Sequence, residues 1–212
     1  MGPLFPIFLN LEDKNCLVIG GGAVAYRKIT SLLKHMAKVT VVSPEANEEI
    51  QNLAENKSIV LKLKSFENED LENMYLVIAA TDNSSLNEKA AFLCRSRGIM
   101  INAVDDPALC DFFVPSVVRR KSLAVAISAE GKSPLFVRLL RQDLETLITE
   151  DYGDLVEFLG EKRNEIKNSF SVDIRRRLLS GLLDEETISL LKEGKVDTIR
   201  ERIEQCISSW QD

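Results

Sequence analysis

The chain has few of the side chains that usually bind metal ions or carry redox chemistry. Its 212 residues include one histidine, His35, and four cysteines, Cys16, Cys94, Cys110 and Cys206. No two cysteines form a C-x-x-C pair, which argues against a zinc knuckle and a dithiol redox motif. Cys16 and Cys94 lie in apolar stretches and are expected in the core, and His35 ends a helical pattern away from other candidate ligands. We therefore expect no metal site.

Long hydrophobic runs are also missing. The longest apolar stretches, such as residues 75–80, have the length of a strand and are far too short to span a membrane. The first residues lack the basic region and cleavage site of a secretory signal, and Gly2 is not followed by the serine or threonine that myristoylation requires. We expect a cytoplasmic protein that does not bind membranes.

An excess of positive charge is absent as well. Lysine and arginine total 27 residues against 33 aspartates and glutamates, a formal net charge of −6. A general nucleic-acid-binding protein normally has a basic excess, so we expect no nucleic-acid partner. Hydrophobic residues make up 45% and charged residues 28% of the chain, as is typical of a globular protein.

Apolar runs of strand length alternate with helical patterns over about the first hundred residues. The expected strands are residues 15–20, 38–43, 59–63, 76–80 and 99–103. This alternation predicts a parallel, doubly wound sheet of the α/β class. Three further elements are expected downstream, namely strands at 112–118 and 123–128 and a helix at 135–150 that Pro134 can begin.

These patterns divide the chain into three regions. Residues 1–113 are predicted to form a Rossmann-type domain, residues 114–150 a small central α+β region, and residues 151–212 a helical C-terminal region. In the last region apolar residues recur at helical spacing. Thr187 is expected early in one of its helices, and Gly194 is expected to end that helix.

A glycine-rich motif follows the first expected strand. Residues 20–25 read Gly-Gly-Gly-Ala-Val-Ala, a G-x-G-x-x-A fingerprint. Gly20 permits the tight turn, Gly22 lets the backbone approach a pyrophosphate, and Ala25 keeps the helix close to the sheet. The helix N-terminus offers N–H groups to the phosphates. Because the motif follows a strand and opens a helix, it predicts a dinucleotide-binding domain.

The acidic residue that often ends the second strand of such domains is missing. Ser43 stands near that position and is followed by Pro44 and Glu45. Glu45 is close enough in the sequence to reach the ribose hydroxyls. No arginine is present there to hold a 2′-phosphate, which favours NAD over NADP.

Polar residues also follow the fourth and fifth strands, at the edge of the sheet where a cofactor should lie. Thr81 and Asp82 come after the fourth strand, although a helix cap by Asp82 or Asn83 explains them nearly as well. Residues 102–107, Asn-Ala-Val-Asp-Asp-Pro, come after the fifth strand. Their two adjacent carboxylates, the first being Asp105, can serve as an acid or base or bind a metal ion, and the alternative is a turn-forming Asp-Pro pair.

Five motifs in this order resemble one family closely. They are Gly20-Gly-Gly-Ala-Val-Ala-Tyr-Arg-Lys28, Ala79-Ala-Thr-Asp82, Asn102-Ala-Val-Asp105, Phe113-Val-Pro-Ser116 and Gly131-Lys-Ser-Pro-Leu-Phe-Val-Arg138. Over about residues 3–150 the sequence resembles precorrin-2 dehydrogenase, the dehydrogenase and ferrochelatase module of siroheme synthases. The helical remainder is similar mainly in length and character.

The resemblance implies that the protein oxidises precorrin-2 to sirohydrochlorin with NAD as hydride acceptor. Some members also insert Fe²⁺ to give siroheme, and members are typically homodimers, with residues 112–128 and 135–150 as candidate interface elements here. The family's essential aspartate falls on Asp105, the predicted catalytic residue. We also expect a stand-alone module without the methyltransferase domain of fused siroheme synthases. The alternative is an NAD-sensing regulatory module without turnover.

The motifs and the resemblance together predict the binding residues. The predicted cofactor-binding residues are Gly20, Gly21, Gly22, Ala23, Val24, Ser43, Pro44, Glu45, Thr81, Asp82 and Asn102. The predicted substrate-binding residues are Arg119, Arg120, Ser128, Lys132 and Arg138. Residues 114–141 hold six basic residues against one acidic residue, a local charge of +5 that suits a substrate with many carboxylates. A solvated hairpin turn at residues 119–121 is the alternative.

One departure from the family pattern concerns regulation. Many bifunctional members have Ser-Ser-Gly-Gly shortly before the Ser-Pro, and a serine there can carry a phosphate. Here the run is Ser128-Ala-Glu-Gly131, which leaves only Ser128 as an acceptor. Regulation by phosphorylation at this point is therefore in doubt.

Overall fold

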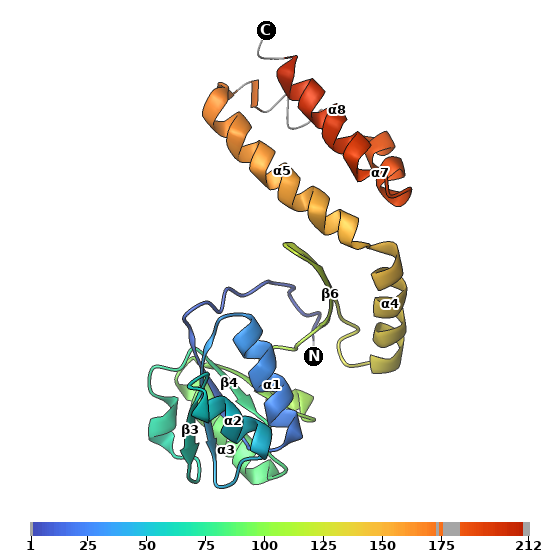
Figure 1. Ribbon diagram of the computed structural model, residues 1–212. Coiled ribbons are helices and arrows are strands. Elements are labelled where there is room, and N and C mark those ends of the chain that lie inside the picture. Colours follow the sequence, from blue (N-terminus) through green and yellow to red (C-terminus); the bar gives the residue numbers. More distant parts are fainter. Residues whose placement is uncertain (1, 173, 176–182, 210–212) are drawn as a thin grey trace. The chain divides into compact units, whose positions relative to one another are not determined.

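The chain forms two compact units, Met1–Val114 and Pro115–Asp212, each with its own core (Figure 1). The computed structural model describes residues 2–172, 174–175 and 183–209. Within these residues no helix is both long and apolar enough to cross a bilayer. The predicted division of the second unit at residue 150 stays a prediction.

A five-stranded parallel sheet forms the centre of the first unit, as predicted, with the strand order β3-β2-β1-β4-β5. Its strands are β1 (Asn15–Ile19), β2 (Lys38–Ser43), β3 (Val60–Leu63), β4 (Leu76–Ala79) and β5 (Met100–Ala103). The helices are α1 (Ala23–Lys34), α2 (Glu48–Glu55) and α3 (Ser84–Ser96), with two short 3₁₀ helices, η1 (Asn68–Leu71) and η2 (Pro107–Leu109). The strand order reverses between β1 and β4, and ligands bind such sheets at the carboxyl ends of the strands near this point.

Both faces of the sheet are covered, which explains why the strands read as continuous apolar runs. Alternate residues of β1 point to opposite faces. Cys16 and Val18 pack with α1 and α2, whereas Leu17 and Ile19 pack with α3. Cys16 is fully buried, and so is Cys94, whereas His35 caps the C-terminus of α1. The predictions for these three residues are therefore confirmed.

The second unit contains an antiparallel hairpin and a set of helices. The elements are β6 (Ser116–Arg120), β7 (Leu123–Ile127), α4 (Pro134–Leu147), α5 (Glu150–Ser169), α7 (Glu185–Lys192) and α8 (Val196–Ser208). Residues of α5, α7 and α8 share one core. Thr187 lies in the first turn of α7, where its N–H donates to Asp184 Oδ1, and Gly194 follows the helix with a φ of 72°. Both positions agree with the sequence-based expectation.

Two predicted boundaries are wrong. The strand expected from residue 112 begins only at Ser116, because the carbonyl of Phe112 accepts from Asn102 Nδ2 at 2.9 Å and Pro115 has no N–H to donate. The helix expected to run to residue 150 ends at Leu147. Thr149 has an extended backbone (φ −73°, ψ 174°) and begins a separate helix, α5, at its N-cap position.

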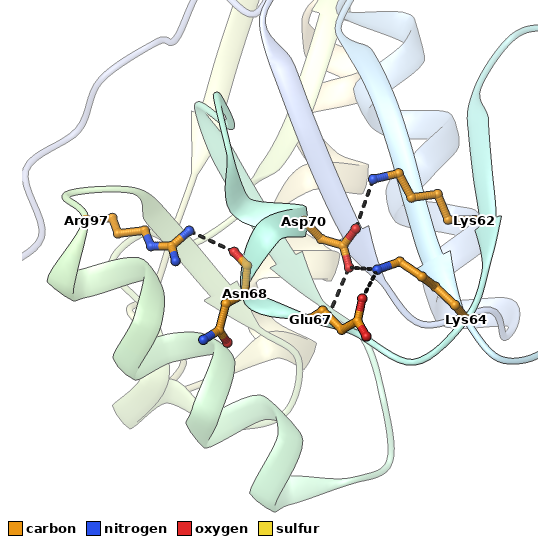
Figure 2. A network of polar contacts seen from close by, with 6 residues as sticks. All are labelled: Lys62, Lys64, Glu67, Asn68, Asp70 and Arg97. Atoms are coloured by element: carbon orange, nitrogen blue, oxygen red, sulfur yellow. Dashed lines mark hydrogen bonds and ion pairs between the residues drawn. The ribbon is translucent and has the colours of Figure 1, made fainter.

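A buried carboxylate ties the connection between β3 and β4 to the edge of the sheet (Figure 2). Asp70 is 2% exposed and accepts from Lys62 Nζ at 2.9 Å and from the N–H of Glu67 at 3.1 Å, and Lys64 Nζ lies 2.9 Å from its other oxygen. Burial alone would raise the pKa of Asp70, but the hydrogen bonds from Lys64 and Lys62 outweigh it and lower the pKa. Asp70 is therefore charged and paired in the folded protein.

The substitution Asp70→Asn should lower the free energy of unfolding by about 1–2 kcal/mol at neutral pH, because Lys62 loses its partner and Lys64 keeps only Glu67, while both lysines stay partly solvated. Since folding lowers the pKa of Asp70, its contribution exists above the unfolded-state pKa and is lost as the pH falls through the folded-state pKa. Urea unfolding at pH 7 and in acid should show the difference from wild type shrinking in acid. The exposed neighbour substitution Glu69→Gln serves as the control, and equal stability of wild type and Asp70→Asn at pH 7 would contradict the expectation.

Candidate functional site

The turn between β1 and α1 has no room for side chains at its first two residues. A Cβ on Gly20, whose φ is +126°, would lie 2.3 Å from the carbonyl oxygen of Ala80. A Cβ on Gly21 would lie 1.8 Å from the carbonyl oxygen of Glu45. A Cβ on Gly22, by contrast, would have no heavy atom within 4 Å. The turn thus packs against the loops after β4 and β2 and leaves open space at Gly22, where a ligand can approach the backbone.

The N-terminus of α1 is suited to bind an anion. Gly22 is its N-cap residue, no side chain caps the helix, and its first turn holds no acidic residue. The N–H groups of Ala23 and Val24 therefore have no partner within their own helix, and the helix dipole adds positive potential. Together with the open space at Gly22, this arrangement fits the pyrophosphate of a dinucleotide.

The loops after β2 and β4 border the same turn. Ser43 is buried at the end of β2, and Pro44 and Glu45 after it are exposed. After β4, the Thr81 hydroxyl donates to Asn87 Oδ1 at 2.7 Å, which ties the loop to α3.

Asn83, and not Asp82, is the residue that caps α3. Its Oδ1 accepts from the N–H of Leu86 at 3.0 Å. Asp82 is exposed and accepts no hydrogen bond within the described part of the chain. Its carboxylate is therefore accessible beside the glycine turn, and its role in cofactor binding stays a prediction.

The two adjacent carboxylates after β5 have different surroundings. Asp106 Oδ1 accepts from the N–H of Ala108 at 3.0 Å and caps η2, which is the turn-forming arrangement. Asp105 is exposed and has a left-handed backbone with a φ of 63°. Its carboxylate accepts no hydrogen bond from any residue that the structure describes. Asp105 is therefore the carboxylate that is available to a substrate.

Side chains on either side of Asp105 hold this loop in place. Asn102 Nδ2 donates to the carbonyl oxygen of Phe112 at 2.9 Å. Asp111 accepts from the N–H of Ile101 at 3.2 Å and from Arg95 Nε at 3.0 Å. The amide of Asn102 thus supports the loop, and its predicted contact with the cofactor stays a prediction.

Lys28 is a residue near this site that the sequence reasoning did not single out. It lies one turn after Val24 on α1 and is half-buried. Burial and the charge of Arg27 lower the pKa of Lys28, and the negative charge of Asp105 partly opposes them. The spacing of four residues from Val24 was the signal that places Lys28 on the same helix face.

In the second unit, the predicted substrate residue Arg120 is engaged by neighbouring helices. Its guanidinium donates to the carbonyl oxygen of Glu145 at 2.9 Å, and its Nε lies 3.3 Å from Glu150 Oε1. Lys121 forms an ion pair with Asp154. The local charge of the hairpin is therefore smaller than residues 114–141 alone suggest, because acidic residues of α5 compensate it.

The other predicted substrate residues are exposed. Arg119 and Arg138 have no ion-pair partner among the residues that the structure describes, and Lys132 Nζ lies 4.0 Å from Glu130 Oε2. Ser128 Oγ accepts from the N–H of Glu130 at 3.1 Å. These four side chains remain accessible within their unit. Among the described residues, no group of three or more histidine, cysteine, aspartate or glutamate side chains is placed to hold a metal ion.

Residues 7–116, slightly more than half of the chain, match a family described as putative NAD(P)-binding. Residues 151–207 match the sirohaem synthase dimerisation region. The chain belongs to this putative NAD(P)-binding family. The resemblance on the five sequence motifs is thereby confirmed, and NAD(P) is the cofactor class, while its contact with the glycine turn stays a prediction.

Siroheme synthases from several bacteria are similar to nearly the whole chain. The siroheme synthase of Ruthia magnifica subsp. Calyptogena magnifica is 39% identical over 198 residues, which cover 91% of this chain and 42% of the relative. That of Thioalkalivibrio sulfidiphilus is 39% identical over 209 residues, 98% of this chain and 43% of the relative. The chain thus spans less than half the length of these relatives.

A solved structure, "SirC, precorrin-2 dehydrogenase", is similar to this chain with a TM-score of 0.78 and 27% identity. The match covers 95% of this chain and 100% of that chain. The α/β fold class with a Rossmann-type parallel sheet is therefore confirmed.

Substitutions at two neighbouring glycines should separate cofactor binding from folding. Gly22→Val places its side chain in open space on an ordinary extended backbone (φ −92°, ψ −173°), so the protein should fold but bind NAD⁺ at least about tenfold more weakly. Gly21→Ala meets the backbone at Glu45 and should lower the unfolding temperature markedly. Calorimetric titration with NAD⁺ and thermal unfolding measure the two effects. Undiminished NAD⁺ affinity in Gly22→Val would rule out this place for the pyrophosphate.

Proposed function

We propose that this protein oxidises precorrin-2 to sirohydrochlorin with NAD⁺ as the hydride acceptor. The observation that carries the proposal is the placement of the accessible Asp105 carboxylate after β5, at the same edge of the sheet as the open glycine turn after β1. The match to a precorrin-2 dehydrogenase structure along almost the full length supports the substrate.

In this proposal different residues of the first unit bind the cofactor and accept the proton. The backbone of Gly22, Ala23 and Val24 holds the pyrophosphate, and exposed Glu45 bonds the ribose hydroxyls. Its negative charge also opposes a 2′-phosphate, which favours NAD over NADP. When bound, the nicotinamide supplies the hydride acceptor. Asp105 takes the proton that the macrocycle releases or orients the macrocycle.

The substrate is a polyanion, and the second unit offers cations to it. Arg119, Lys132 and Arg138 are exposed and can pair with carboxylates of the macrocycle, with Ser128 as a hydrogen-bonding neighbour. Arg120 contributes less in this proposal because Glu145 and Glu150 already engage it. Iron insertion is a second activity that the sequence resemblance implies, and it stays a prediction.

The variant pair Asp105→Asn and Asp106→Asn tests the chemistry. Anaerobic turnover of precorrin-2 with NAD⁺, followed by NADH absorbance and the macrocycle spectrum, should fall at least about 100-fold in Asp105→Asn, since the proton acceptor is lost. NAD⁺ binding should be unchanged. Asp106→Asn keeps an oxygen that can cap η2, so it should retain activity.

Three results of this assay would change the conclusion. Full turnover in Asp105→Asn would refute the assigned role of this carboxylate. No turnover in the wild type with NAD⁺ still bound would favour the regulatory, NAD-sensing alternative. A further spectral change on adding Fe²⁺, faster than the enzyme-free control, would add the chelatase activity.

We also propose that the protein forms a homodimer. The match to a dimerisation region at residues 151–207 supports this. α4 ends just before that region and supplies an apolar surface. No residue of α4 is buried within the chain, and Leu135, Phe136 and Leu139 are all more than half exposed. Such a contiguous exposed apolar patch is typical of an interaction surface.

Placing charge on α4 should disrupt the dimer. We expect Phe136→Asp combined with Leu139→Asp to convert a dimer into a monomer in light scattering, because charged groups would be buried without partners. Phe92→Asp changes an even more exposed aromatic residue, on α3, and should leave the mass unchanged. A dimer that persists in the α4 double variant would place the interface elsewhere.

A further inference from the structure

The thiol of Cys110 contacts both sides of the turn that carries Asp105. Its Sγ lies 3.1 Å from the carbonyl oxygen of Ala103 and 3.3 Å from that of Asp106. Asn102 Nδ2 lies 3.4 Å from the same sulfur. One side chain therefore connects the residues before and after Asp105 with the end of β5.

The turn at Asp105 depends on support of this kind. Its φ of 63° is left-handed, a conformation that residues other than glycine adopt rarely. The backbone hydrogen bond that closes the turn, from the N–H of Asp106 to the carbonyl oxygen of Ala103, is long at 3.4 Å. The Asp105 carboxylate accepts no hydrogen bond within the described residues, so the backbone of the turn is what determines where this side chain leaves the chain.

The protonation state of Cys110 suits it to this contact. Burial raises the pKa of the thiol, and the nearby carboxylates of Asp106 and Asp111 raise it further, whereas the charge of Arg95 lowers it. The net shift is upward, so the thiol keeps its proton at neutral pH and can donate to a carbonyl oxygen.

A purely space-filling role does not describe this cysteine. Cys94 has such a role, because it is fully buried among apolar residues around α3 and its thiol makes no hydrogen bond within the described residues. Cys110 is only half-buried, and its polar contacts all go to the segment around Asp105.

We propose that Cys110 is a positioning residue for the oxidation, and that its thiol fixes the peptide groups flanking Asp105 so that the carboxylate is held in its working direction. The inference rests on the proposed function. It adds a residue that acts through Asp105 and does not itself touch the substrate.

Three variants test this role, Cys110→Ala, Cys110→Ser and Cys94→Ala. In Cys110→Ala the kcat for precorrin-2 oxidation should fall about tenfold or more, because small misplacement of a reacting group is costly, while the affinity for NAD⁺ is unchanged. In Cys110→Ser a hydroxyl donor is retained, and most of the rate should return. Cys94→Ala creates a cavity in the same unit and should lower stability without changing kcat.

A second measurement does not depend on activity. Amide hydrogen exchange of residues 104–106 should be faster in Cys110→Ala than in the wild type and should return toward the wild-type rate in Cys110→Ser. Cys110→Val fills the space of the thiol but has no hydrogen-bond donor. It replaces the alanine variant if that variant does not fold.

The outcomes distinguish this proposal from the proposed function. An active wild type together with unchanged kcat and exchange in Cys110→Ala refutes the role of Cys110 alone. A kcat loss that serine does not restore, and that matches the loss in Cys94→Ala, refutes it as well. A wild-type protein that binds NAD⁺ but does not oxidise precorrin-2 overturns the proposed function, and the role of Cys110 in that oxidation with it.

Discussion

The close packing of the β1–α1 turn against two neighbouring loops is the constraint on which the first unit depends. The N–H of Gly20 donates to the carbonyl oxygen of Val42 at 3.0 Å, and the N–H of Asn47 donates to that of Gly21 at 2.9 Å. Backbone contacts of this kind need glycines, since a Cβ would overlap a carbonyl oxygen. As a result the ends of β1, β2 and β4 converge, while Gly22 stays open to a ligand.

Most of the first unit could be predicted from the sequence because its signals are local. A buried strand followed by a glycine motif and a helix lies within twenty residues, and each strand is a continuous apolar run. The boundaries that were wrong depend on distant contacts or on a missed helix start. The strand expected from Phe112 begins later, because the Phe112 carbonyl accepts a hydrogen bond from Asn102. The helix expected to run to residue 150 ends earlier, because Thr149 is the N-cap of a new helix inside a continuous helical pattern. The ion pair of Lys121 with Asp154 joins residues 33 positions apart, which no local pattern reveals.

In the candidate site, too, some residues are indicated by local sequence motifs, and others only by contacts that form when the chain folds. The sequence indicates an acidic pair after β5. Only the folded structure distinguishes Asp106, which caps a short helix, from Asp105, whose carboxylate is available to a ligand. Cys110 belongs to no motif, and the motif that contains Lys28 gives that residue no role. Their relation to Asp105 appears only when the loop after β5 has folded back toward α1.

The buried pairing of Asp70 with Lys62 and Lys64 bears on how the protein avoids aggregation. β3 is an outer strand of the sheet and exposes Val60 and Leu63, so its free backbone groups could pair with a strand of another molecule. Lysines along an outer strand oppose such pairing because their charge resists burial. Asp70 holds both ammonium groups beside this strand, so the contact that ties down a loop also keeps charge at this outer edge of the sheet.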